Sequence, residues 1–171
     1  RYKLLYEYGG WWTDMDITCL QSLNIEQPFV FRTHHKLKLV GNLMKCPKNS
    51  ILMKICYERA IIEINTENKD WHKPIQILVD EVKKQNLENY ILELTNPDSW
   101  DLIRTYLLQN LSIPENWYAI HWINEEWRRN HIRKDFFLNN STLGFLMNKC
   151  ELYSKKISFL REFIIILICY T

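Results

Sequence analysis

The chain has 171 residues, of which 47% are hydrophobic and 25% are charged. This balance is typical of a globular domain and argues against a disordered chain. The net charge is only +2, so no overall field attracts the protein to nucleic acid or to an anionic membrane surface. The apolar run at residues 163–171 is far shorter than the roughly 20 residues that span a bilayer. We therefore expect no nucleic-acid partner and no membrane span in this piece.

The first half of the chain predicts two helices and two short strands. Residues 2–8 are expected to end a helix, with Gly9 and Gly10 as its C-cap. Short strands are expected at residues 11–13, as a buried strand, and at 28–31, followed by a polar basic loop through residue 38. The segment after Cys46 has helical periodicity, with Asn49 or Ser50 as the N-cap.

The second half continues the alternation of helices and strands. A helix is expected over residues 74–85, with Ile75, Leu78, Val79 and Val82 facing inward. Strands are expected at 90–94 and 117–122, and Ser99 is expected to cap a short helix through residue 108. The chain from Ser141 onward resembles one long amphipathic helix. This alternation predicts the α/β class.

Five cysteines are widely scattered without any C-x-x-C pair, so zinc-ribbon and thioredoxin-type sites have no support. We expect free cysteines in a reducing cytoplasm, with the Golgi lumen or membrane association as alternatives in a eukaryote. The chain begins at Arg1 without an initiator Met. We therefore expect a piece of a longer protein.

Asp14 and Asp16 lie one residue apart after an expected buried strand. Because carboxylates are rarely buried without a partner, the two side chains are expected either to be solvated or to face a positive group. The D-x-D pattern alone is weak evidence, since chance produces it often and a solvated turn would explain it. Here it follows an expected strand, and ligands of α/β sheets bind where strands end. Oxygens at positions i and i+2 suit Mg²⁺ or Mn²⁺, which take few protein carboxylates and leave positions for substrate phosphate.

Three motifs resemble one enzyme family. The opening "RYKLLYEYGGWWTDMDITCLQSL" resembles the sugar-binding region of D-x-D glycosyltransferases, family-32-like enzymes and capsular polysaccharide synthesis proteins. The matching positions are Arg1, Leu5, Gly9, Gly10, Asp14 and Asp16. Two later segments, "GNLMKCPKNSILMKICYERA" and "WYAIHWINEEWRR", are similar to the family's following elements.

The resemblance implies a GT-A-type nucleotide-sugar transferase fold whose N-terminal βαβ half is missing from this chain. It implies one partial catalytic domain over residues 1–171. Within it, residues 1–45 are the metal and donor region, 46–116 a helical acceptor-side region, 117–135 the H-x-W-x-x-x-W region, and 141–171 a C-terminal helix. The implied activity is metal-dependent transfer of a hexose, with retention, from a UDP- or GDP-hexose. The acceptor would be a hydroxyl group on a glycan, a lipid-linked molecule or a protein.

The resemblance also implies a role for each candidate site residue. Asp16 is expected to bind Mn²⁺ or Mg²⁺ directly, and Asp14 to contact the donor's ribose or sugar or a metal-bound water. His121 is expected to be a metal ligand or to contact the phosphates, with Trp122 close to it. The remaining donor contacts are expected from Arg1, Asn42, Trp122 and Trp127. Asn42 is expected to hydrogen-bond a substrate hydroxyl, and Trp127 is alternatively expected to shape the acceptor cleft.

Arg128 and Arg129 are expected to add phosphate contacts, because guanidinium groups bind phosphate bidentately. A plainer interpretation of the surrounding basic run, residues 127–134, is a solvated face. A plainer interpretation of His121 is a residue of the core. The alternative for the whole chain is a truncated, inactive glycosyltransferase remnant that acts as a binding module or has no function.

Overall fold

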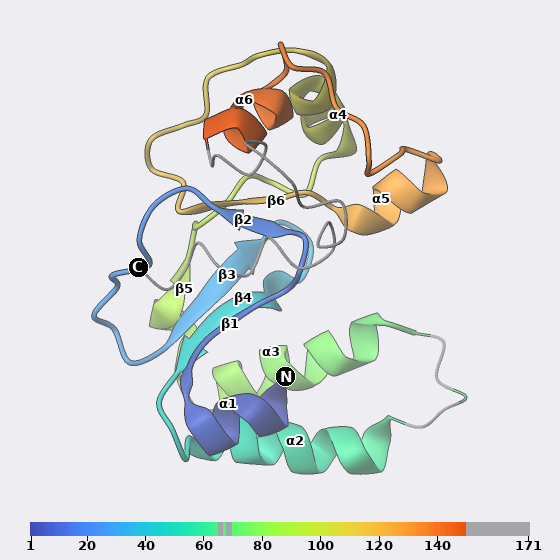
Figure 1. Ribbon diagram of the computed structural model, residues 1–171. Coiled ribbons are helices and arrows are strands. Elements are labelled where there is room, and N and C mark those ends of the chain that lie inside the picture. The colour runs from blue at the N-terminus through green and yellow to red at the C-terminus, as the bar shows by residue number, and fades with distance from the viewer. Residues whose placement is uncertain (65–66, 68–69, 150–171) are drawn as a thin grey trace. The chain divides into compact units, whose positions relative to one another are not determined.

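The computed structural model describes residues 1–64, 67 and 70–149 (Figure 1). The chain forms two compact units. Unit 1 comprises Arg1–Asp14 and Asn24–Leu94, and unit 2 comprises Met15–Leu23 and the chain from Thr95 onward. The boundary between the units falls inside the D-x-D motif, so Asp14 ends a segment of unit 1 and Asp16 belongs to unit 2.

Unit 1 contains a mixed four-stranded sheet in the order β1-β4-β3-β5. Its strands are β1 (Gly10–Thr13), β3 (Val30–His34), β4 (Lys38–Cys46) and β5 (Ile91–Leu92). The β3–β5 pair is parallel, and the other two pairs are antiparallel. β4 is an internal strand, and six consecutive residues of it, from Leu39 to Met44, are buried.

The described residues of unit 1 also form the α-helices α1 (Tyr2–Tyr8), α2 (Ile51–Glu63) and α3 (His72–Lys84), with a 3₁₀ turn η1 (Glu88–Tyr90). α1 packs against α2, α2 against α3, and α3 against β4 (Figure 1). Their shared core joins residues of all three helices with Phe31 of β3 and Met44 of β4. The Ser50 side chain accepts a hydrogen bond from the Met53 amide and so caps α2.

The helices of unit 1 confirm the sequence predictions more closely than its strands do. The predicted helix at residues 2–8 with its Gly9 C-cap, and the Ser50 cap of α2, are confirmed. In α3, Leu78 and Val82 are buried as predicted, Ile75 and Val79 are only partly buried, and Ile77 and Glu81 are buried as well.

The strand predictions in unit 1 were partly wrong. The strand at 11–13 exists but is half-buried, because β1 lies at the edge of its sheet. The strand expected at 28–31 is found at Val30–His34, and the one at 90–94 is only Ile91–Leu92. β4 was missed, because a strand buried on both faces lacks the alternation that marks strands in a sequence.

Unit 2 contains a two-stranded antiparallel sheet of β2 (Ile17–Cys19) and β6 (Ala119–His121), with Ile17 opposite His121. Its helices are α4 (Trp100–Leu108), α5 (Asn124–Arg129) and α6 (Thr142–Lys149). A separate core joins α4, β6, α5 and α6 through Ile103, Ile120, Trp127 and Leu146. The α4 helix and its Ser99 cap are confirmed, whereas β2 and α5 were not predicted.

The remaining structural predictions have mixed outcomes. α6 agrees with the start of the helix expected over 141–171, and the rest of that prediction lies outside the described residues. Cys46 and Cys56 are free and buried, and burial raises the pKa of each thiol to about 12. Cys19 is disulfide-bonded, so the expectation of free cysteines was wrong there, because sequence spacing does not reveal spatial pairing. Within the described ranges, no helix is long and apolar enough to cross a bilayer.

Candidate metal and donor site

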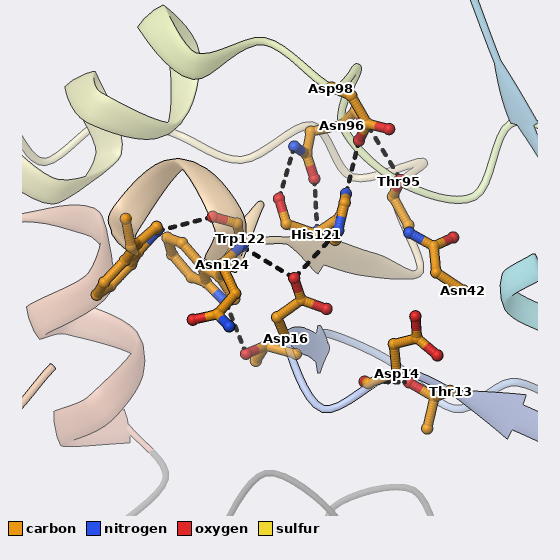
Figure 2. A network of polar contacts seen from close by, with 12 residues as sticks. Thr13, Asp14, Asp16, Asn42, Thr95, Asn96, Asp98, His121, Trp122 and Asn124 are labelled. Atoms are coloured by element: carbon orange, nitrogen blue, oxygen red, sulfur yellow. Dashed lines mark hydrogen bonds and ion pairs between the residues drawn. The ribbon is translucent and has the colours of Figure 1, made fainter. Parts of the chain in front are cut away.

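Asp16 lies directly before β2, and the pairing of β2 with β6 brings its side chain to the end of β6. Its Oδ2 atom is 3.3 Å from His121 Nε2 and accepts a hydrogen bond of 2.9 Å from the Asn124 amide (Figure 2). Its main-chain carbonyl accepts another from the Trp122 amide at 2.9 Å. The residue is therefore held through its backbone and its carboxylate by one short segment, 121–124.

His121 is held between two carboxylates. Its Nδ1 atom is 2.6 Å from Asp98 Oδ1, on the side of the ring opposite Asp16 (Figure 2). Asn96 holds the His121 backbone by accepting from its amide at 2.7 Å and donating to its carbonyl at 3.0 Å. His121 thus has a fixed backbone position, and each of its ring nitrogens faces a carboxylate.

The two shifted pKa values in this cluster have the same origin. Burial alone would raise the pKa of the Asp16 carboxyl, but the His121 hydrogen bond and charge, with the Asn124 amide, outweigh it and lower that pKa. Burial alone would lower the pKa of His121, but hydrogen bonds to Asp16 and Asp98 and their charges raise it. Asp16 is therefore ionised at neutral pH.

Ile123 gives the segment 121–124 its shape. Its φ of 51° and ψ of 57° place it in the left-handed region, which is unusual for a β-branched residue. The turn lets the amides on both sides of Ile123 reach Asp16. Backbone strain of this kind costs of order 1–3 kcal/mol and often accompanies functional sites.

Trp122 and Trp127 are core residues of unit 2. Their rings meet edge to face, with centroids 6.3 Å apart, and each residue is less than a tenth exposed. Both indole N–H groups are used, since Trp122 donates to Thr18 Oγ1 and Trp127 donates to the Trp122 carbonyl. Each indole supports the segment after His121, and direct donor contact by either ring stays a prediction.

Arg128 and Arg129 lie on the exposed side of α5. Arg128 pairs with Glu125, and Arg129 pairs with both Glu125 and Glu126. A phosphate would compete with these carboxylates, which are themselves solvated. Phosphate binding by the two arginines stays a prediction.

Asp14 has neighbours of a different kind from those of Asp16. In unit 1, Asp14 Oδ2 accepts from Arg1 Nη2 at 3.2 Å, and Asp14 Oδ1 accepts from Trp12 Nε1 at 2.7 Å. The Arg1 guanidinium also donates to the Gly41 carbonyl at 2.7 Å and lies over the Trp12 ring. This arrangement makes Asp14 part of a charged, hydrogen-bonded cluster between the start of α1 and the end of β1.

Asn42 also belongs to unit 1. It is 9% exposed, and its side-chain oxygen lies 3.4 Å from Arg32 Nη1. Its main-chain carbonyl accepts from the Asp14 amide at 2.8 Å. Asn42 thus fixes the backbone of Asp14, and the predicted contact with a substrate hydroxyl is not tested by this geometry.

Among residues 1–64, 67 and 70–149, no group of three or more His, Cys, Asp and Glu side chains is arranged to hold a metal ion. Asp16 and His121 provide two facing ligand atoms. Unit 2 also contains a cavity of about 780 Å³ lined by residues of segments 18–21, 110–117 and 142–149. None of the predicted site residues lines it, so we assign it no role.

Asp98 and Asn96 were not among the residues predicted from the sequence. Both lie in "TNPDS" (95–99), between the expected strand at 90–94 and the cap of α4. An Asn-Pro-Asp turn directly after a strand was the available signal, because turns that follow strands often carry binding residues.

Comparison with protein-family models supports the resemblance for the start of the chain. Residues 1–31 match the family described as "Glycosyltransferase sugar-binding region containing DXD motif". The match includes Arg1, Asp14 and Asp16 and supports a glycosyltransferase-related role, and the mixed α/β structure is compatible with an α/β glycosyltransferase-like fold. No curated protein and no solved structure matched the chain.

Proposed function

We propose that this chain is the catalytic part of a metal-dependent glycosyltransferase. It moves a hexose, with retention, from a UDP- or GDP-hexose to a hydroxyl of a glycan, a lipid-linked molecule or a protein. The observation that carries the proposal is the pairing of Asp16 with His121, because the second aspartate of the matched motif faces a further metal-ligating side chain.

The residues fit a hard divalent cation. Ligands about 2.1 Å from an octahedral Mg²⁺ lie roughly 3 Å apart, and the Asp16 and His121 atoms are 3.3 Å apart. The Asp16 side chain is 24% exposed, so it keeps an edge open to a ligand. Carboxylate suits Mn²⁺, and neutral imidazole is the commonest side-chain metal ligand. Asp16 and His121 would hold the ion, leaving other positions for donor phosphates.

When bound, such an ion stabilises the negative charge that develops on the departing diphosphate, which is worth several kcal/mol of barrier. Arg1 and Asp14 contact the donor sugar in this proposal. Their mutual hydrogen bond supports it, because a fixed ion pair offers both donor and acceptor atoms to sugar hydroxyls. Asn42 binds a substrate hydroxyl, and Arg128 and Arg129 bind phosphate.

The test is calorimetric titration of UDP and GDP into the full chain, with and without Mn²⁺. Asp16→Ala is compared with Asp101→Ala, which removes an exposed carboxylate from α4 in the same unit. We expect Mn²⁺-dependent binding by the wild type and by Asp101→Ala, and binding at least about tenfold weaker in Asp16→Ala, as for loss of a charged ligand.

Absence of nucleotide binding in the presence of Mn²⁺ would overturn the proposal, as would equal binding by Asp16→Ala. Circular dichroism of each variant confirms that the fold is intact. Turnover is measured separately, as release of UDP or GDP from the hexose donors. Metal-dependent binding without release would favour the alternative of an inactive binding module.

A further inference from the structure

The closest partner of the His121 ring is Asp98, a residue that the matched segment does not include. The Nδ1–Oδ1 distance is 2.6 Å, against 3.3 Å between Nε2 and Asp16 Oδ2. Asp98 and His121 side chains are 15% and 13% exposed. Hydrogen bonds to a carboxylate are strong, and more so where water is partly excluded. The ring therefore has one short contact and one longer contact, each to a carboxylate.

A neutral imidazole has one proton to share between two nitrogens, and the stronger hydrogen bond decides which nitrogen holds it. The shorter contact favours Nδ1–H, donated to Asp98. Nε2 then presents its lone pair on the side of Asp16. Only this tautomer can offer Nε2 to a cation that Asp16 also binds, because a protonated nitrogen is not a ligand.

We infer that Asp98 is a positioning residue, which keeps the imidazole proton on Nδ1 and so leaves Nε2 as a metal-ligating atom beside Asp16. That Nε2 binds a metal ion rests on the proposed function, whereas the position of the His121 ring proton on Nδ1 does not. Asn96, two residues earlier, fixes the His121 backbone through two hydrogen bonds. The segment before α4, residues 95–99, thus orients both the backbone and the ring of His121.

Replacing Asp98 by Asn keeps the side-chain volume nearly constant but reverses which ring nitrogen of His121 is expected to hold the proton. The amide of the new side chain can donate to Nδ1, so the ring proton moves to Nε2 and pairs with Asp16. Cation binding then has to displace that proton and break the pair. Outer-shell partners of metal-ligating histidines typically contribute about 10- to 100-fold in metal affinity, and we expect a loss in that range.

The experiment uses the full chain in the metal-free state and with Mn²⁺ alone. Nitrogen NMR of ¹⁵N-labelled histidine, at alkaline pH where the ring is neutral, reports which His121 nitrogen carries the proton. Electron paramagnetic resonance reports the Mn²⁺ affinity. Asp98→Asn is compared with the matched control Asp101→Asn, which makes the same change of charge three residues away on the exposed surface.

We expect Nδ1–H in the wild type and in Asp101→Asn, with Nε2–H and weakened Mn²⁺ binding in Asp98→Asn. A wild-type ring protonated at Nε2 overturns the inference, even if Asp98→Asn does not fold. Unchanged tautomer and unchanged Mn²⁺ affinity in a folded Asp98→Asn overturn it as well. If the tautomer switches but the wild type binds no Mn²⁺, the proposed function fails and the positioning role stands.

Discussion

Ile123 concentrates backbone strain beside Asp16, and that strain should be measurable. Replacing it by Ala or by Gly removes nearly the same apolar contacts, but only Gly tolerates a φ of 51°. The left-handed region costs L-residues roughly 1–2 kcal/mol. We expect Ile123→Gly to have a free energy of unfolding about 1 kcal/mol higher than Ile123→Ala in urea titrations. An Ala variant as stable as the Gly variant would contradict the strain.

His121 should make stability depend on pH in a defined direction. Folding raises its pKa, so the stabilisation by the charged ring is fully present below about pH 6.5, the usual pKa of His. It is lost as the pH rises through the folded-state pKa. In metal-free buffer, we expect His121→Asn to reduce the free energy of unfolding more at about pH 6 than at about pH 9. An equal reduction at both pH values would contradict the charged ring.

Site residues that belong to a sequence motif could be predicted, whereas those that contact a residue distant in the sequence could not. Asp14, Asp16 and His121 were predicted as site residues because motif spacing marks them, and their roles stay predictions. Asp98 contacts a residue 23 positions away, and no local pattern encodes that distance. The burial of Trp122 and Trp127 was equally hidden, because a tryptophan in a motif suits a core as well as a ligand surface.

The junction of α1 and β1 depends on two adjacent glycines with different requirements. Gly9 and Gly10 both have positive φ, of 69° and 80°. A Cβ atom on Gly9 would overlap the backbone nitrogen of Lys48, whereas one on Gly10 would meet nothing within 4 Å. We expect Gly10→Ala to cost roughly 1–2 kcal/mol from backbone strain alone and Gly9→Ala to cost clearly more. Chemical denaturation of both variants provides the comparison, and equal costs would contradict the overlap.

Among the secondary-structure elements, helices with side-chain caps were predicted best. Ser50 and Ser99 mark the starts of α2 and α4, because a hydroxyl that accepts from a first-turn amide is a local signal. β2 and β4 were missed for different reasons. β2 is three residues long, and β4 contains Gly41-Asn42, which resembles a turn until burial on both faces is known.

For the molecule as a whole, cation binding should appear as added stability. A ligand present at 100 times its dissociation constant stabilises the folded state by about 2.7 kcal/mol. We expect Mn²⁺ to raise the melting temperature of the wild type and of Asp101→Asn, and EDTA to reverse the change. Asp16→Asn should show little response, and a full response in that variant would point to binding elsewhere on the chain.

The division into two units could not be predicted from the sequence. The chain changes unit after Asp14, Leu23 and Leu94, and none of these junctions has the Gly-rich or Pro-rich composition of a linker. Whether the chain forms one catalytic domain, as the sequence resemblance implies, stays a prediction.

The pairing of β2 with β6 joins two strands that the ribosome synthesises at widely separated times. Ile17 pairs with His121, so β2 leaves the exit tunnel long before its partner strand exists. At about 5–20 residues per second, the roughly 100 residues from Ile17 to His121 take about 5–20 s to synthesise. Unit 1 has its sequence complete at Leu94 and can fold during this time. The Asp16–His121 pair therefore forms late, and a nascent chain that stops before residue 121 cannot contain it.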